Sequence, residues 1–201
     1  ARASNISTAP FPSKNSKVYL VDISFENPHD EYFMNEAAFW DSNATAALGR
    51  YLNWELLGAV IWATAYTAQE QLKMIRDGDV WKFDQLPQRI SAVHEMLLAG
   101  PPAGYEALAI YVHCAGGCDR TGEFVGAYRM NYHHTSSLVS IYDEDVVECG
   151  RAPDYYASGA LGWYCLTWNM DNSKLTPIQH CLDAYVCEPF GSCNASTPSP
   201  Q

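Results

Sequence analysis

The side chains with the clearest chemical potential in this sequence are a cysteine and an arginine separated by five residues. Residues 107–122 begin as an apolar, strand-like run that ends at His113 and Cys114, and Arg120 and Thr121 then open a segment with helical character. A cysteine attacks as its thiolate, and the free N–H groups and positive dipole end of a helix stabilise that charge. The same N–H groups bind a phosphate dianion. The spacing therefore predicts a phosphate-binding loop that contains a nucleophile.

The residues between Cys114 and Arg120 suit this role. Small side chains let a backbone wrap closely around phosphorus, and the planar guanidinium of Arg120 can hold two phosphate oxygens. The hydroxyl of Thr121 is expected near the sulfur, where it would help the thiolate to leave in a second step. The predicted phosphate-binding residues are Ala115, Gly116, Gly117, Cys118, Asp119 and Arg120.

This stretch resembles the signature loop of the protein tyrosine phosphatase superfamily, His-Cys-x5-Arg-[Ser/Thr], in its dual-specificity and lipid-phosphatase branch. Asp119-Arg120-Thr121 is also similar to the Asp-Arg-Thr of the myotubularin and Sac phosphoinositide phosphatases. The resemblance covers residues 77–132, and its specific part is 113–122. It implies that Cys114 is the nucleophile and that His113, buried behind the loop, hydrogen-bonds to backbone and orients it. We expect no cofactor and no metal.

The resemblance also implies a general acid, an aspartate on a loop roughly 30–40 residues before the nucleophile. Asp79 is the first choice, because the Phe four residues after it matches the dual-specificity pattern, and Asp84 and Asp77 are the alternatives. Asp119 would repel a dianion if it pointed into the loop. We therefore expect it to point outward and bond to backbone or a neighbour, the alternative being a proton donor inside the loop.

Cysteine usage and sequons point to an oxidising compartment. Five of the 7 cysteines fall in the last 53 residues of the chain, a density typical of secreted proteins. Sequons occur at Asn5, Asn43 and Asn194, both ends are rich in Ser, Thr and Pro, and the chain begins at Ala1 as a processed protein would. We expect a secreted or lumenal protein that carries N-linked glycans.

An odd number of cysteines leaves one thiol over, and Cys114 is the natural candidate. The other six would form three disulfides, with Cys187 and Cys193 the most favourable local pair across a short turn. Cys118 has two possibilities. It pairs outside the loop and leaves Cys114 free, or it pairs with Cys114 and stops catalysis.

Charge and hydropathy limit the partners. The net charge is −11 and there is no basic run, which argues against nucleic acid. The longest nearly apolar stretch, 56–63, is too short to cross a bilayer. We expect a phosphorylated protein or a small phosphomonoester as the substrate, and self-assembly is a further possibility.

Hydrophobic periodicity predicts the order of elements. A strand over 17–24 is followed by a turn over 27–30, a buried helix over 48–66 with a polar tail to 76, a helix over 86–98 and a strand over 105–112. Further helices are expected over 121–132, 138–149 and 175–187, while 155–168 is undecided. This order predicts an α/β fold with a mostly parallel central sheet flanked by helices, phosphatase-like, with a disulfide-stapled C-terminal region.

The 201 residues are enough for one domain, which we place at 17–193, between a flexible leader (1–16) and a Ser/Thr/Pro-rich tail (194–201). Two functions fit this sequence. The first is a secreted or lumenal cysteine-dependent phosphatase acting through a phosphocysteine intermediate. The alternative is a catalytically retired glycoprotein of the same fold that serves as an extracellular structural, coat or filament subunit.

Overall fold

The computed structural model describes residues 16–30, 33–42, 45, 47–133, 135, 137–173 and 175–182, and the backbone of 186–187 and 193–194. Asn5, Asn43, most of the predicted leader and nearly all of the predicted tail lie outside the described residues. Asn194 is described only as backbone. The three sequons are therefore left as predictions.

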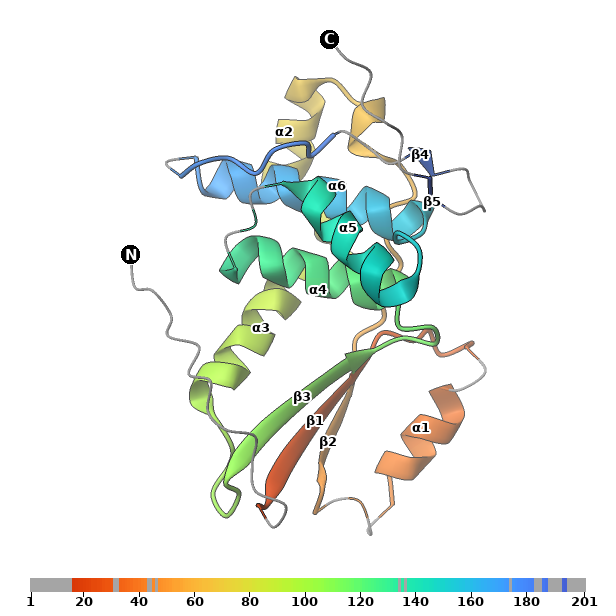
Figure 1. Cartoon of the computed structure of the whole chain (residues 1–201), viewed down its shortest axis with the longest axis vertical. Helices are drawn as coiled ribbons and strands as arrows, with labels where there is room; N and C mark the ends of the chain where they lie inside the picture. The colour runs from red at the N-terminus through yellow and green to blue at the C-terminus, as the bar shows by residue number, and fades with distance from the viewer. Residues whose placement is uncertain are drawn as a thin grey trace.

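Three parallel strands form a sheet at one end of the molecule (Figure 1). The strands are β1 (Val18–Ser24), β2 (Gly49–Asn53) and β3 (Ala107–His113), in the order β2-β1-β3. Ser24 pairs with both Asn53 and His113, so the carboxyl ends of the strands are level. In open parallel sheets ligands bind at this edge. The α/β class and the parallel sheet agree with the sequence prediction.

Helices lie beside the sheet and beyond its carboxyl edge (Figure 1). The short helix α1 (Phe33–Trp40) lies next to β2, and α3 (Leu86–Ala99) lies next to β3. Beyond the strands, α4 (Asp119–Tyr132) packs along α6 (Tyr155–Asp171), with α5 (Leu138–Cys149) against both. Eleven residues of α6 are buried, so this helix forms the centre of the helical part. None of the described helices is both long and apolar enough to span a bilayer.

The predicted buried helix over 48–66 is wrong. Its first part is β2, and an extended segment then leads to a short 3-10 helix, η1 (Ala63–Ala65). A Cβ on Gly49 would lie 1.8 Å from the Leu20 carbonyl oxygen, so only glycine fits this close approach of β2 to β1. Gly58 has φ +71° and contacts the Tyr156 backbone. The apolar residues here are spaced as in a helix, but the chain is extended. Trp62 packs on Tyr155 of α6 and Leu56 and Ala63 are buried, whereas Leu48, Leu57, Val60 and Ile61 are exposed.

The polar end of that segment is nevertheless helical. α2 (Ala68–Arg76) begins at Thr67, whose side chain caps the backbone N–H of Glu70 while Glu70 caps Thr67 in return. It is followed by the one-turn 3-10 helix η2 (Asp79–Trp81). The indole N–H of Trp81 donates to Thr167 in α6 at 3.3 Å, which anchors η2 to the core.

The predicted helix over 175–187 is also wrong. Residues 175–182 have no helix, and His180 adopts φ +64°. Cys181 instead forms a disulfide with Cys165 of α6, with Cα atoms 5.4 Å apart. The backbone of β4 (Val186–Cys187) pairs antiparallel with β5 (Cys193–Asn194), and Cys187 stands opposite Cys193. The side chains of that predicted disulfide lie outside the described residues.

Candidate active site

The cysteine predicted as the nucleophile stands at the carboxyl edge of the sheet. Cys114 follows β3 directly, and the loop after it ends where α4 begins at Asp119. Its side chain is buried, and among the described cysteines it alone is free. The hydroxyl of Thr121, in the first turn of α4, donates to Cys114 Sγ at 3.3 Å. This is the strand–loop–helix arrangement expected from the sequence, with the hydroxyl beside the sulfur.

The loop backbone has open space around its two glycines. A Cβ built on Gly116 or Gly117 would meet no heavy atom within 4 Å. Gly117 has φ +72°, a conformation that suits glycine and turns the chain toward α4. A ligand oxygen can therefore approach the backbone closely here, as a phosphate-binding loop requires.

A disulfide ties the loop to the helical part. Cys118, the last loop residue, is bonded to Cys149 at the end of α5, with Cα atoms 5.8 Å apart. Of the two possibilities open for Cys118, the structure therefore has the pairing outside the loop. Cys114 is left as a thiol.

The carboxylate of Asp119 faces away from a dianion in the loop. It binds both amino groups of Arg151, at 2.5 and 2.6 Å, and accepts the backbone N–H of Asp154 at 2.8 Å. Burial would raise the pKa of Asp119, but these hydrogen bonds and the charge of Arg151 outweigh it and lower the pKa. Asp119 therefore fixes the start of α4, as expected for an acid that points outward.

The guanidinium of Arg120 is held by the turn that follows β1. Its Nη1 donates to Asp30 Oδ2 at 2.7 Å and to the Phe25 carbonyl at 3.1 Å. The hydrogen bond from Arg120 lowers the pKa of Asp30. Burial disfavours the charge on Arg120, but Asp30 outweighs it and raises the pKa of the guanidinium. Both contacts use one amino group of the guanidinium.

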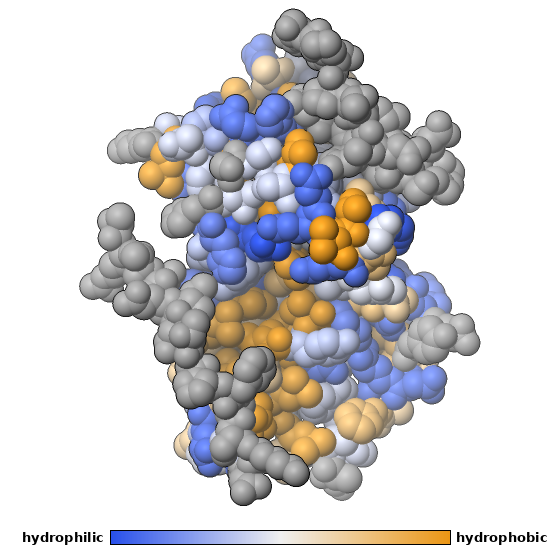
Figure 2. All heavy atoms as spheres, in the orientation of Figure 1, coloured by the Kyte–Doolittle hydropathy of each residue, from blue (hydrophilic) through white to orange (hydrophobic). Residues whose placement is uncertain are grey.

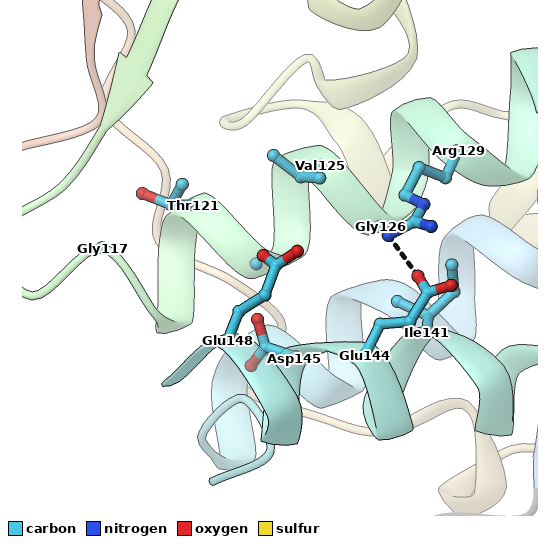
Figure 3. A pocket seen from close by; sticks show the side chains of 10 residues that line it. Gly117, Thr121, Val125, Gly126, Arg129, Ile141, Glu144, Asp145 and Glu148 are labelled. Atoms are coloured by element: carbon cyan, nitrogen blue, oxygen red, sulfur yellow. Dashed lines mark ion pairs between the residues drawn. The ribbon is translucent and has the colours of Figure 1, made fainter. Parts of the chain in front are cut away.

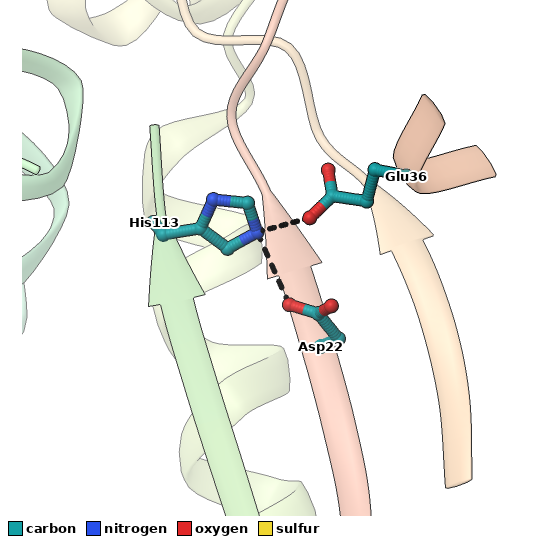
Figure 4. Close-up of side chains that lie close together, drawn as sticks. All are labelled: Asp22, Glu36 and His113. Carbon is teal, nitrogen blue, oxygen red and sulfur yellow. Dashed lines mark ion pairs between the residues drawn. The ribbon is translucent and has the colours of Figure 1, made fainter. Parts of the chain in front are cut away.

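His113 makes contacts that the resemblance did not imply. Its Nε2 lies 3.1 Å from Asp22 Oδ1 of β1 and 2.8 Å from Glu36 Oε1 of α1 (Figure 4). Its backbone carbonyl accepts the N–H of Phe25 at 2.8 Å. The side chain is therefore oriented by two carboxylates, where a bond to backbone was expected.

The three aspartates considered as the general acid have other partners. Asp79 is paired with Lys82 at 2.6 Å and Asp77 with Lys73 at 2.7 Å, all with exposed side chains. Asp84 is buried and accepts the backbone N–H of Leu57 at 3.1 Å. These contacts lie outside the signature loop, and Figure 1 shows α2, just before Asp77, at the far end of the helical part.

A shallow pocket lies between α4 and α5 (Figure 3). Glu144, Asp145 and Glu148 of α5 line it. Asp145 packs against Gly122, where a Cβ would lie 2.7 Å from its Oδ1. Burial, aided by the charge of Asp119, raises the pKa of Asp145 to about 7. Arg129 also lines the pocket and is paired with Glu144, so three carboxyl groups and one already paired cation make this pocket unsuited to an anionic ligand.

Sequence reasoning missed Asp22, Asp30 and Glu36 as neighbours of the loop. The place of Asp30 could have been predicted from the sequence. The turn over 27–30 was expected directly after a strand, and the carboxyl end of that strand must lie beside the carboxyl end of β3. Glu36 lies on α1, a helix that the periodicity did not reveal, so nothing brought it to the site.

No protein-family model matches this chain, and no curated protein matches its sequence. The case for a phosphatase therefore rests on the residues of the loop and on their geometry.

Proposed function

We propose that this protein is a cysteine-dependent phosphatase that hydrolyses phosphomonoesters through a phosphocysteine intermediate. One observation carries the proposal. A free, buried thiol stands between the end of β3, an edge strand of the parallel sheet, and a helix N-terminus, with a hydroxyl 3.3 Å from its sulfur and an arginine six residues on. The loop donors and the helix dipole favour the thiolate and a bound phosphate alike.

Binding begins at the loop. The phosphoryl oxygens accept hydrogen bonds from the loop N–H groups and from Nη2 of Arg120, the amino group that the contact with Asp30 does not use. The Cys114 thiolate then attacks phosphorus, so that a P–S bond forms as the bond to the leaving oxygen breaks. The loop N–H groups and the guanidinium hold the charge of the equatorial oxygens throughout this step.

The departing oxygen needs a proton, and Asp30 is the carboxyl group that the structure holds against Arg120. A dianion bound to Arg120 competes for the guanidinium and brings negative charge close to Asp30. Both effects raise the pKa of Asp30 and favour its acid form. After the alcohol departs, the Asp30 carboxylate takes a proton from water, which attacks the phosphocysteine. The P–S bond breaks, and Thr121 stabilises the thiolate that leaves.

Asp79, the first choice from the sequence, can act as the general acid only if its loop reaches the thiol. It is held by Lys82, and that ion pair would have to open. Asp30 needs no such movement, so we assign it the acid role.

The cysteines bear on the compartment in which we propose that the enzyme acts. Among the cysteines that the structure describes, two disulfides beside one free thiol are compatible with a secreted or lumenal protein, and the sequons add N-linked glycans to this proposal. We propose phosphorylated proteins and small phosphomonoesters alike as substrates, because the composition of the loop does not choose between them.

The retired, structural alternative is favoured by the Asp30–Arg120 pair, because a carboxylate already occupies the arginine that a phosphate needs. Turnover decides between the two. The purified chain, with its disulfides intact, is given an aryl phosphate, and we expect hydrolysis that Cys114→Ser abolishes without changing the circular dichroism spectrum. Absence of turnover in the wild-type protein, or its survival in Cys114→Ser, would refute the enzyme.

A further inference from the structure

We propose that Asp22, Glu36 and His113 form a binding site for a divalent first-row transition metal ion, next to the signature loop. One residue comes from each of three elements, β1, α1 and β3 (Figure 4). This triad shares no side chain with the thiol, the arginine or the acid of the proposed phosphatase. It is therefore a separate site.

The distances within the triad match a coordination shell. Ligand bonds to such ions are about 2.0–2.2 Å long, which puts neighbouring ligand atoms about 2.8–3.6 Å apart in octahedral or tetrahedral geometry. His113 Nε2 lies 2.8 Å from Glu36 Oε1 and 3.1 Å from Asp22 Oδ1. One ligand atom from each of the three residues falls within 4.8 Å of the others. An ion can therefore contact all three at once.

The orientation of the buried atoms points to a shared partner. Asp22 is 7% exposed, and within the described residues neither its Oδ1 nor His113 Nε2 has a hydrogen bond of acceptable geometry. The two atoms are nevertheless 3.1 Å apart. Buried polar atoms without a partner are costly. Two such atoms that are close but poorly aligned with each other are what ligands of a common ion look like.

The second oxygens of the carboxylates are held by other donors. The indole N–H of Trp40 donates to Asp22 Oδ2 at 2.8 Å, and the hydroxyl of Tyr51 donates to Glu36 Oε2 at 3.2 Å. The ring of Tyr111 stacks on the imidazole, with centroids 4.9 Å apart. Outer contacts of this kind fix metal ligands in position. They aim Oδ1, Oε1 and Nε2 toward the same point.

Charge and donor type select the ion. The triad brings two carboxyl groups together with one imidazole, and Glu26 and Asp30 add further acidic groups at this edge. A divalent cation neutralises the pair. One nitrogen with two oxygens favours zinc or manganese over calcium and magnesium, which prefer all-oxygen shells. The side chains are 10–20% exposed, so water can complete the shell.

Zinc is the probe for the test, and calorimetry of the chelator-treated full chain with intact disulfides is the measurement. We expect one Zn²⁺ per chain, with at least tenfold weaker binding in Asp22→Asn and in Glu36→Gln. Trp40→Phe keeps all three ligands but frees Asp22 Oδ2, so it should weaken binding about tenfold. Circular dichroism checks that each variant folds, and Glu36→Gln, on the outer helix α1, provides a test if Asp22→Asn fails to fold.

Two controls locate the ion. Cys114→Ser must retain the bound Zn²⁺, because a thiolate site would lose it. Glu148→Gln, which removes an exposed carboxylate of α5, must also retain the bound Zn²⁺. If Zn²⁺ instead bound nonspecifically to the acidic surface, this variant would bind less of it. Loss of binding in Cys114→Ser, unchanged binding in Glu36→Gln, or no Zn²⁺ bound to the wild-type chain would overturn the proposal. None of these outcomes bears on whether the protein hydrolyses a phosphate ester.

Discussion

Replacing Asp30 by Asn should tighten the binding of tetrahedral oxyanions and at the same time impair catalysis. In the resting protein Asp30 holds Arg120 at 2.7 Å, with side chains that are 31% and 24% exposed. A charge-assisted hydrogen bond at this exposure contributes about 1–2 kcal/mol. An anion that binds Arg120 must compete with that contact. Its removal should therefore strengthen tungstate binding about five- to thirty-fold.

The same variant should lose turnover selectively. Without the acid, kcat for an alkyl phosphate, whose leaving oxygen must be protonated, should fall about 100- to 10,000-fold. For p-nitrophenyl phosphate, whose leaving group departs as an anion, it should fall less than about tenfold. Tungstate affinity is measured by calorimetry and turnover by phosphate release. Asp79→Asn is the matched control and should change neither. Weaker tungstate binding in Asp30→Asn, or a selective loss in Asp79→Asn, would refute the assignment of Asp30.

Three further predictions concern Arg120, the disulfide between Cys118 and Cys149, and the buried carboxyl group of Asp145. Arg120→Lys should reduce kcat/KM for an aryl phosphate about 100-fold or more, because an ammonium lacks the fixed planar fork with which a guanidinium binds two oxygens side by side, and a loss below about fivefold would contradict this. Replacing Cys118 and Cys149 together by Ser removes a crosslink between residues 31 apart and should lower the free energy of unfolding in urea by about 3–4 kcal/mol, whereas an unchanged urea midpoint would show that the crosslink contributes nothing. The pKa of Asp145 is raised from 3.8 to about 7, so between these two pH values the folded state keeps a proton that the unfolded chain releases. The free energy of unfolding should therefore fall as pH rises from about 4 through 7, by about 4 kcal/mol at most. Asp145→Asn should flatten this dependence in urea titrations, and an equally steep fall in the variant would assign it to other groups.

The part of the fold that local patterns specify was predictable. The apolar run before Cys114 is β3, the polar-apolar periodicity of 138–149 gives α5 with those bounds, and 86–98 is α3 with one residue more. The helices α3 and α5 bury a face that their own sequences encode, and the side chains of Leu108, Ile110 and Val112 of β3 pack, partly buried, against the core.

The elements that were missed depend on partners distant in the chain. Residues 48–66 have apolar side chains at helical spacing, but parallel pairing of β2 with β1 and the contact of Gly58 with Tyr156 decide their shape. A disulfide to Cys165 holds 175–182 away from a helix. Tertiary contacts override local propensity in both cases.

The candidate site divides in the same way. The thiol, the hydroxyl beside it and the arginine lie within one contiguous stretch, so the sequence alone placed them together. Asp22, Asp30 and Glu36 come from the first strand and from the residues after it, and only the parallel register of β1 with β3 brings them to the loop. Spacing along the chain carries no information about such contacts.

The most direct test of the central claim is to trap the covalent intermediate. The protein is mixed with an aryl phosphate, quenched in acid within milliseconds and digested, and the peptide that carries Cys114 is examined by mass spectrometry. We expect a phosphoryl group on Cys114 sulfur that disappears in the Cys114→Ser variant. Hydrolysis of the substrate without any phosphorylated Cys114 peptide, or with the phosphoryl group on another residue, would contradict it.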